Sequence, residues 1–406
     1  MNSPTSLQIS LNGVPVGTMV RLADDRNYFS FDPSYVARSD RPTLSLSFKD
    51  QSGELMTRPQ STQTRLPPFF SNLLPEGRLR DYLAEKAGVH SEREFFLLWM
   101  LGDDLPGAVK IDPPWEDHFA ATFFRATTTV STESLLRFSL AGVQLKFSAV
   151  REAHGGLTIP ARGTGGDWIV KLPDAHYSGV PENEYAMMQL AREVGIDVPD
   201  IDLVHMDQIA GIPFEAQHLG SHAFAIKRFD RVEGSAVHME DFAQVFGVYP
   251  KQKYEKASFE NLARVISIEV GQDGVLAYVR RLVFSMLIGN GDMHLKNWSL
   301  LYPDGRQAAL APAYDYVSTI PYIPKDKLAL NLGSSKHFRD MDMPRFHRLA
   351  DRAMVARAMI EDEVRDTVSR FADVWRSRGE ELAGPHLKSV IDAHLRTIPL
   401  WRALAT

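Results

Sequence analysis

Apolar and polar residues alternate along the first fifty positions, which is the period of a half-buried β-strand. Residues 7–11 alternate, Asn12-Gly13 has the composition of a type I′ turn, and residues 14–16 resume the alternation. Residues 27–32 and 43–48 (TLSLSF) repeat the pattern. These segments predict a hairpin that extends into a small antiparallel sheet.

Helical spacing replaces the alternation after the two prolines at 67–68. Residues 73–87 and 92–101 predict two helices, and residues 107–111 (GAVKI) predict a closing strand. The stretch 1–112 therefore forms a predicted α+β domain without an obvious catalytic set. Its prominent polar residues are interpreted as helix-end and surface groups, namely Asn72, Glu76, Arg78 and Arg80.

A Pro- and Thr-rich stretch follows and marks a boundary between predicted domains. Beyond it, residues 137–148 (RFSLAGVQLKFS) predict a strand, a turn of small residues and a second strand. Residues 168–172 (WIVKL) predict an apolar strand, residues 183–194 an amphipathic helix, and residues 224–231 a strand leading out of this region. We place this second domain at residues 113–231.

The remainder, residues 232–406, is predicted to be mainly α-helical. Helical spacing of apolar residues recurs in six segments, at 238–247, 259–269, 274–289, 344–356, 360–378 and 385–404.

Composition narrows the class of protein. With 406 residues the chain exceeds the size of a single core, and 44% hydrophobic with 24% charged residues is typical of a soluble globular protein. A net charge of −6 gives no overall attraction to nucleic acid or membrane, and the absence of cysteine excludes disulfides and is compatible with the cytoplasm. The N-terminus has no signal-peptide pattern, and the longest apolar run, 95–101, is too short to span a bilayer.

The richest polar stretch is residues 288–299, IGNGDMHLKNWS. It follows an apolar run at 283–288 and precedes a strand-like run at 298–302, and its glycines predict a loop between two buried elements. Loops held by a rigid scaffold often carry catalytic groups.

The spacing within this loop is that of a protein-kinase catalytic loop. Asp292 and Asn297 are five positions apart (297 − 292 = 5). In kinases the Asp at this spacing orients the substrate hydroxyl and the Asn holds Mg²⁺. Asp315 follows eighteen residues later (315 − 297 = 18), where a kinase has its second metal-holding acid.

Two further segments have a kinase interpretation and an ordinary one. Lys171 could contact nucleotide phosphates and pair with Glu184 on the next helix, or it could lie at a strand edge while Glu184 only favours a helix N-terminus. The backbone of residues 227–229 could contact adenine. Otherwise the charged residues there form an exposed cluster, namely Arg228, Asp230 and Arg231.

Taken in order, several motifs together resemble the HipA family of serine/threonine kinase toxins from bacterial type II toxin–antitoxin modules. The resemblance covers roughly residues 7–390. The motifs that carry it are LPPFFSNLLPEGRLRDYL, GAVKI, SLAGVQLKFS, WIVKLP, NEYAMMQLA with GIDVP, KRFDR, HMEDFAQVFG, NGDMHLKN and PAYDYVS.

The resemblance implies ATP and Mg²⁺ as cofactors and a role for each site residue. Asp292 matches the catalytic base, Asn297 and Asp315 the metal-holding pair, and Lys171 the lysine on the ATP phosphates. Ser139 matches the serine that the best-known members autophosphorylate. The remaining implied nucleotide contacts are Ala141, Gly142, Val143, Gln144, Leu145 and Lys146 in the phosphate loop, Lys227, Arg228 and Phe229 at the adenine, and His294, Lys296 and Tyr314.

The expected fold is α+β, with an N-terminal small-sheet and helix domain followed by a two-lobed, protein-kinase-like fold whose C-terminal lobe, 232–406, is mainly α-helical. The expected partners are a HipB-like helix-turn-helix antitoxin, operator DNA through that antitoxin, and a protein substrate such as an aminoacyl-tRNA synthetase; no membrane partner is expected. Two alternatives stay open: a small-molecule phosphotransferase of the aminoglycoside or choline kinase type, and a catalytically weak corepressor.

Overall fold

The computed structural model describes residues 5–77, 80, 81, 84, 90–102, 104–112, 145–152, 156–159, 166–174, 176–212 and 218–405. The chain forms two compact units. Unit 1 consists of Met1–Ser178, Val204–Lys251 and Leu301–Arg306, and unit 2 of Gly179–Leu203, Gln252–Leu300 and Gln307–Thr406. Each unit is considered by itself. The division into domains 1–112, 113–231 and 232–406 stays a prediction.

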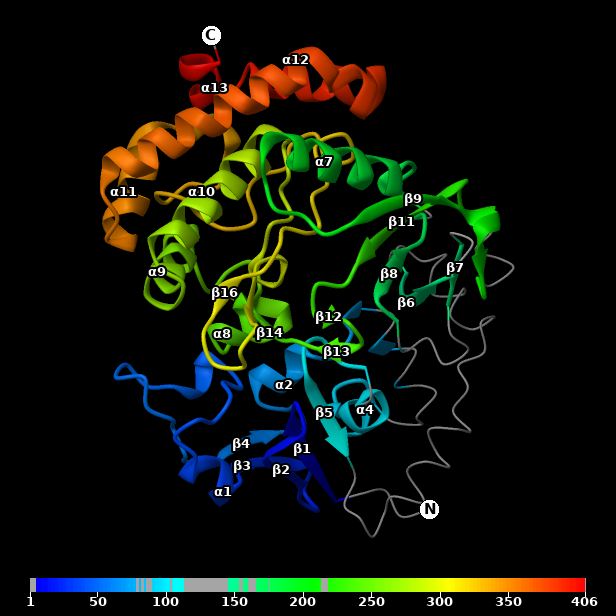
Figure 1. Ribbon diagram of the computed structural model, residues 1–406, viewed down its shortest axis with the longest axis vertical. Coiled ribbons are helices and arrows are strands. Elements are labelled where there is room, and N and C mark those ends of the chain that lie inside the picture. The colour runs from blue at the N-terminus through cyan, green and yellow to red at the C-terminus, as the bar shows by residue number, and fades with distance from the viewer. Residues whose placement is uncertain are drawn as a thin grey trace. The chain divides into compact units, whose positions relative to one another are not determined.

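Unit 1 begins with a five-stranded antiparallel sheet in the order β4-β3-β2-β1-β5 (Figure 1). Its strands are β1 Ser6–Leu11, β2 Val14–Arg21, β3 Arg26–Phe31, β4 Gln60–Gln63 and β5 Val109–Asp112. The predicted hairpin is confirmed, because Asn12 and Gly13 both have positive φ, at 49° and 77°, as a type I′ turn requires. Leu7, Ile9 and Leu11 are fully buried, so the alternating face of β1 is the core face.

Short helices cover this sheet and complete its core. They are α1 Pro33–Ala37, α2 Pro68–Asn72, α4 Glu94–Leu101 and the 3₁₀ helix η1 Leu46–Phe48. Phe29 on β3 packs against Phe48 and Phe70, with ring centroids 5.6 and 4.8 Å away. Of the predicted helix at 73–87, the described residues 73–76 are not helical, whereas residues 77, 80, 81 and 84 are helical.

The predicted strand at 43–48 is wrong, because its second half is the 3₁₀ helix η1. The side chain of Ser45 caps this helix by accepting from the backbone N–H of Ser47 at 3.1 Å. The carboxylate of Glu240 then accepts from the Leu46 N–H at 3.0 Å and from the Ser45 hydroxyl at 2.5 Å. The two backbone N–H groups are thus bound by side chains and are not available to a sheet ladder.

Glu240 is completely buried among neutral donors. Besides its two contacts with the segment around η1, it accepts a hydrogen bond from the Tyr302 hydroxyl at 2.5 Å. Burial raises the pKa of Glu240 to about 7, although these hydrogen bonds favour the carboxylate. His238 stacks on Tyr302 at 5.5 Å, and burial lowers the pKa of its imidazole to about 4. Burial thus disfavours the charged form of both Glu240 and His238.

Replacing Glu240 by glutamine is expected to change the pH dependence of folding. Because the pKa of Glu240 is raised from 4.5 to about 7 in the fold, its contribution to stability is complete below pH 4.5 and is lost as pH rises through 7. Relative to wild type, the variant should therefore gain about 3 kcal/mol in unfolding free energy between pH 4.5 and pH 8. Urea titrations at several pH values measure this change.

The titration of His238 does not disturb this comparison of wild type with Glu240→Gln. His238 loses its stabilising contribution in the opposite direction, as pH falls from 6.5 toward 4, but it is present in both proteins and cancels in the difference. A stability difference that stays constant from pH 4.5 to pH 8 would contradict the assignment of Glu240.

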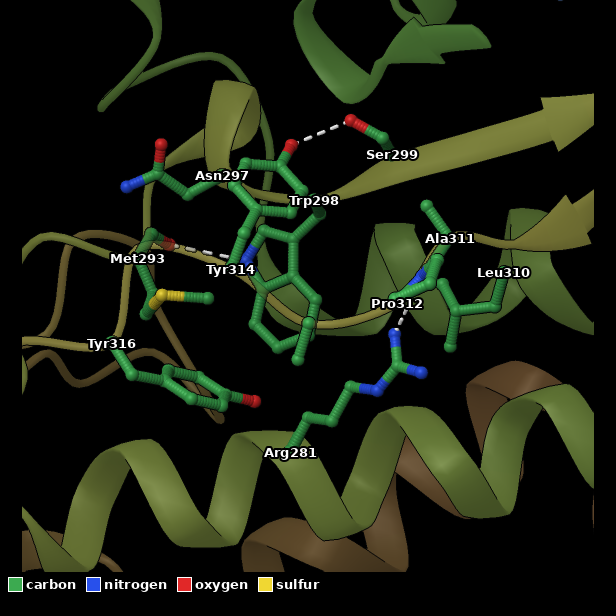
Figure 2. Close-up of a pocket in the computed structure, with 11 residues that line it drawn as sticks. Arg281, Met293, Asn297, Trp298, Ser299, Leu310, Ala311, Pro312, Tyr314 and Tyr316 are labelled. Carbon is green, nitrogen blue, oxygen red and sulfur yellow. Dashed lines mark hydrogen bonds between the residues drawn. The ribbon is translucent and has the colours of Figure 1, made fainter. Parts of the chain in front are cut away.

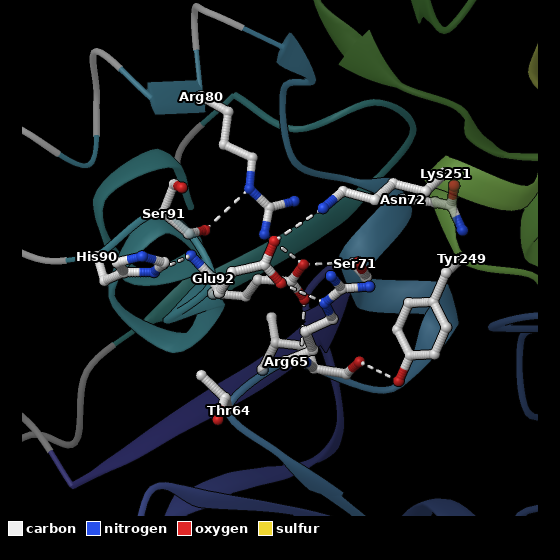
Figure 3. A network of polar contacts seen from close by, with 12 residues as sticks. Thr64, Arg65, Ser71, Asn72, Arg80, His90, Ser91, Glu92, Tyr249 and Lys251 are labelled. Atoms are coloured by element: carbon white, nitrogen blue, oxygen red, sulfur yellow. Dashed lines mark hydrogen bonds and ion pairs between the residues drawn. The ribbon is translucent and has the colours of Figure 1, made fainter.

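A second polar network joins α2 and α4 to the segment that contains Tyr249 and Lys251 (Figure 3). Glu94 is 1% exposed and pairs with Arg80 at 2.5 Å, while Asn72 is 4% exposed and donates to the Val248 carbonyl at 2.8 Å. Asn72 does end helix α2, as predicted, but its interpretation as a surface group is wrong, and the Arg80 side chain is only 14% exposed. Their partners are distant in the sequence, so the local helical pattern gives no sign of burial.

The other sheet of unit 1 has the order β10-β7-β6-β8-β11-β9 (Figure 1). Its strands are β6 Lys146–Arg151, β7 Leu157–Thr158, β8 Trp168–Lys171, β9 Ile201–His205, β10 Ile209–Ala210 and β11 His222–Lys227, and β9 crosses from unit 2 into unit 1. The central strand β8 pairs antiparallel with β6 and β11 and is almost entirely buried.

Smaller elements follow β11 in unit 1. They are β12 Arg231–Val232, β13 Ser235–Ala236, β14 His238–Asp241 and α8 Phe242–Val245, while η3 Met206–Gln208 precedes β10 and η5 Pro250–Gln252 lies where the chain passes from unit 1 into unit 2. The stretch 238–247, predicted as helix, is thus a strand followed by one helical turn. Asp241 forms a capping box with Gln244, which starts α8 only after the strand has ended.

Unit 2 is mainly helical, as predicted. Its elements are α7 Val180–Val194, α9 Phe259–Glu269, α10 Gln272–Leu287, α11 Met343–Ala353, α12 Arg357–Leu395, α13 Pro399–Leu404, the 3₁₀ helices η6 Leu295–Asn297 and η7 Phe338–Asp340, and the strand β16 Ala309–Leu310. Strand β15 Ser299–Tyr302 begins in unit 2 and ends in unit 1. Helix α12 packs against α7 and α10, and α9 packs against α11 (Figure 1). Among the described residues, no helix has the length and apolar character needed to cross a membrane.

Candidate active site

The predicted catalytic loop leaves α10 at a fully buried point. Residues 283–288 at the end of this helix are buried, and Gly289 follows with φ of 67°. A Cβ at Gly289 would lie 2.6 Å from a side-chain carbon of Ile320, so both the conformation and the space favour glycine. The helix end is therefore a rigid starting point for the loop.

Asp292 and Asn297 are joined directly within this loop. The amide nitrogen of Asn297 donates to the backbone carbonyl of Asp292 at 2.8 Å. His294 accepts from the Lys296 N–H through Nδ1 at 3.2 Å and starts the 3₁₀ helix η6 that carries Asn297. With Nδ2 of Asn297 turned to the loop, its Oδ1 is the atom that can serve as a cation ligand.

Asn290 links the loop to Asp315, and the sequence interpretation did not include it. This fully buried side chain accepts from the Asp292 N–H at 2.9 Å and donates to the Asp315 carbonyl at 3.4 Å. Asp315 itself has φ of 58°, a left-handed conformation that few non-glycine residues adopt. Strained residues of this kind concentrate at functional sites. The structure thus brings together the three predicted acid and amide residues of unit 2.

Thr319 and Asp326 hold the loop from outside it, and neither was predicted. The Thr319 hydroxyl donates to Asp326 and accepts from the Gly291 N–H at 2.8 Å. Asp326 is anchored further by the Lys327 N–H at 2.8 Å. A Cβ at Gly291 would meet the Asp326 carboxylate at 2.1 Å, so this position accepts no side chain without moving Asp326.

A small pocket lies behind Asn297, between the loop and α10 (Figure 2). The Tyr314 hydroxyl bonds Ser299 at 2.6 Å and donates to the Lys296 carbonyl at 3.0 Å, so this predicted nucleotide contact also braces η6. Arg281 reaches the pocket from α10 and donates to the Ala311 carbonyl at 2.5 Å. Burial lowers the pKa of Arg281.

One residue far from the loop in sequence contacts Asp292 directly. The hydroxyl of Tyr254 donates to Oδ1 of Asp292 at 2.6 Å. Tyr254 lies in the stretch KQKYEKAS, which has no periodic pattern, and it precedes Asp292 by 38 residues. The sequence carries no local signal that would have revealed this contact.

Glu184 lies on α7 of unit 2 and is 1% exposed, and the other predicted residues that the structure describes lie in unit 1. Lys171 ends β8, is 4% exposed, and has its Nζ 5.4 Å from the ring centroid of Phe224 on β11. Lys146 on β6 is the direct cross-strand neighbour of Lys171, and Leu145 before it is buried. Two lysines therefore lie side by side on this sheet, one exposed and one buried.

The segment 227–229 follows β11, but the interpretation of its charges as an exposed cluster is wrong. Arg228 and Asp230 are 8% and 4% exposed, and they form a two-pronged ion pair with both distances at 2.9 Å. Arg228 and Arg231 both also pair with Asp104, at 2.8 and 3.0 Å. Lys227 is exposed and Phe229 half-buried, and their predicted role at adenine stays a prediction.

Part of the predicted site lies outside the described residues. This part comprises the predicted autophosphorylation site and most of the phosphate loop, namely Ser139, Ala141, Gly142, Val143 and Gln144.

Comparison with known families identifies the class of protein. A family model described as the HipA N-terminal domain matches residues 7–112, and one described as the HipA-like C-terminal domain matches residues 138–375. The second match alone covers more than half of the chain, so the chain belongs to the HipA family. The expected fold class, an N-terminal sheet domain followed by a kinase-like fold with a mainly helical C-terminal part, is confirmed.

Individual relatives agree with this family. A presumed kinase of Sinorhizobium fredii, Y4dM, is 50% identical over 409 residues that cover all of both chains. The serine/threonine-protein kinase toxin HipA of Shewanella oneidensis is 28% identical, with 64% of this chain and 65% of that protein covered. In the solved complex of Shewanella oneidensis HipA, HipB and operator DNA, one chain matches with a TM-score of 0.71 at 20% identity, over 96% of each chain.

Proposed function

We propose that this chain is a serine/threonine protein kinase that uses Mg-ATP and acts as the toxin of a bacterial type II toxin–antitoxin module. The observation that supports this most directly is the linked set of Asp292, Asn297 and Asp315, held together by Asn290 in unit 2. Its spacing and hydrogen bonding suit phosphoryl transfer, in which positioning and charge neutralisation supply most of the catalysis.

Each residue then has a role. Asp292 orients the acceptor hydroxyl and receives its proton, while Asn290 and Asn297 fix the backbone on both sides of it. Lys171, on its buried strand, neutralises charge on the α- and β-phosphates of ATP.

The residues fit a magnesium ion. Mg²⁺ prefers oxygen ligands and is usually held by one or two carboxylates together with substrate phosphates. Asp315 offers a carboxylate and Asn297 the oxygen of an amide whose nitrogen is engaged. Among the described residues, no group of three or more His, Cys, Asp or Glu side chains is placed to bind a metal alone. The bound ion would neutralise charge on the transferred phosphoryl group.

The proposed partners follow from the relatives. The Shewanella protein was solved with HipB and operator DNA, so we infer a HipB-like helix-turn-helix antitoxin and, through it, operator DNA. We infer that the substrate is a translation-related protein such as an aminoacyl-tRNA synthetase, and that the reaction takes place in the cytoplasm.

The proposal is tested by incubating the purified chain with radiolabelled ATP, with and without Mg²⁺, in the presence of a bacterial lysate. We expect Mg²⁺-dependent labelling of a lysate protein and of the chain itself, and mass spectrometry should place the phosphate of the chain on Ser139. Labelling of an aminoglycoside or choline, with all proteins unlabelled, would instead indicate a small-molecule phosphotransferase. A chain that neither binds nor hydrolyses ATP would indicate a corepressor.

A further inference from the structure

The phenol of Tyr254 contacts Asp292, the proposed catalytic base. Asp292 is exposed, although Gly291 and Met293 on either side of it are buried. Packing therefore restrains the backbone more than the carboxylate, and an exposed side chain has several staggered rotamers within reach. The 2.6 Å hydrogen bond from Tyr254 to Oδ1 selects one of them.

Tyr254 is itself fixed to the loop. Its ring lies edge-on to the ring of His294, with centroids 4.9 Å apart and an interplanar angle of 83°. Its carbonyl accepts from Nζ of Lys336 at 2.9 Å, and the carbonyl of the preceding Lys253 accepts from the Leu295 N–H at 3.3 Å. The phenol is thus held at a constant position relative to the residues that flank Asp292.

The orientation of the Asp292 carboxylate matters for the proposed chemistry. An ionised carboxylate accepts hydrogen bonds through its two oxygens, and the Tyr254 hydroxyl fixes the position of one of them, Oδ1. A general base must lie about 2.6–3.2 Å from the proton it takes, so its orientation affects the chemical step more than the binding of nucleotide.

We propose that Tyr254 is a positioning residue, which holds the Asp292 carboxylate in the orientation that receives the acceptor hydroxyl. This proposal rests on the proposed function, in which Asp292 takes the proton of that hydroxyl. The alternative, a phenol that blocks the place of the acceptor, makes the opposite prediction for activity.

Tyr254→Phe removes the donor and keeps the ring against His294. We expect kcat for phosphoryl transfer to fall about tenfold, with KM for ATP within about a factor of two of wild type, because the loss lies in the orientation of the base. Tyr28→Phe is the matched control, since Tyr28 has a similar exposed fraction, 40% against 38%, and lies on β3 of the N-terminal sheet. This control should behave as wild type.

Two comparisons separate positioning from a merely structural role. In an Asp292→Asn background, adding Tyr254→Phe should lower the residual rate by less than about a factor of two, because the residue acts through Asp292. An unchanged or increased kcat in Tyr254→Phe, or a further tenfold loss in the Asp292→Asn background, would overturn the proposal.

A readout without catalysis keeps this test independent of the proposed function. In crystal structures of the full chain, the Asp292 side chain should occupy one rotamer in wild type and more than one in Tyr254→Phe. If wild type transfers no phosphate, the proposed function fails, and the rotamers still decide whether Tyr254 holds Asp292. The same single rotamer in both proteins would refute the positioning role.

Discussion

Replacing Asp292 by asparagine is expected to lower the rate of phosphoryl transfer by about 10²–10⁴-fold, the usual contribution of a general base. Asparagine has nearly the same size and retains an oxygen that can accept from the Tyr254 hydroxyl. The backbone contacts of residue 292 with Asn290 and Asn297 do not depend on its side chain. The change therefore removes the charged proton acceptor and leaves these backbone contacts in place.

Initial rates of label transfer from ATP, together with calorimetric ATP affinity, measure this effect. Asp373→Asn is a suitable control, because Asp373 lies on α12, has a side chain that is 74% exposed, and forms a 3.8 Å ion pair with Arg376. The control should keep its rate, and both variants should bind ATP as wild type does. A rate for Asp292→Asn within a factor of about three of wild type would reject Asp292 as the base.

The second large effect is expected for Gly291→Ala. The new methyl group would lie 2.1 Å from Oδ2 and 2.4 Å from Cγ of Asp326, well inside van der Waals contact. Asp326 cannot turn away freely, since Thr319 and the Lys327 N–H both hold its carboxylate. The loop must shift instead, and because a displacement of about 1 Å can cost about 10²-fold in rate, kcat should fall by that factor.

A double variant gives the matched control. Asp326→Ala removes the clashing carboxylate, so adding Gly291→Ala to it should lower kcat by less than about a factor of three, against about 10² in the wild-type background. Steady-state kinetics of the four proteins measure this coupling. Equal losses in both backgrounds would mean that the steric conflict with Asp326 is not the cause.

The sequence was informative wherever the functional residues are close together along the chain. The apolar end of α10, two glycines and the polar residues up to Asn297 occupy one continuous stretch, so spacing alone placed Asp292 and Asn297 on a loop between buried elements. The hairpin of β1 and β2 was equally predictable, because the alternation of apolar and polar residues and the turn residues are both local in the sequence.

It was not informative where a distant partner decides the outcome. Residues 43–48 alternate like a strand, yet a carboxylate 194 positions further on stabilises a 3₁₀ helix there. Likewise Asn290, Thr319, Asp326 and Tyr254 support the loop through contacts that no periodicity encodes. Arg228 and Asp230 resembled surface charges, yet both are buried, because Arg228 pairs with Asp230 and also with Asp104 from the N-terminal part of the chain.

Hydrogen bonds inside unit 1 limit how far this chain could be shortened or recombined. The carbonyls of Leu66, Phe69 and Val248 receive hydrogen bonds from side chains on the other side of the boundary at residue 112. The Gly107 N–H likewise donates to Asp230. A gene fragment beginning after residue 112 would leave these partners and their apolar surroundings exposed to water. Although one family model ends at residue 112 and the other begins at residue 138, the two parts are therefore expected to be inherited, expressed and exchanged together.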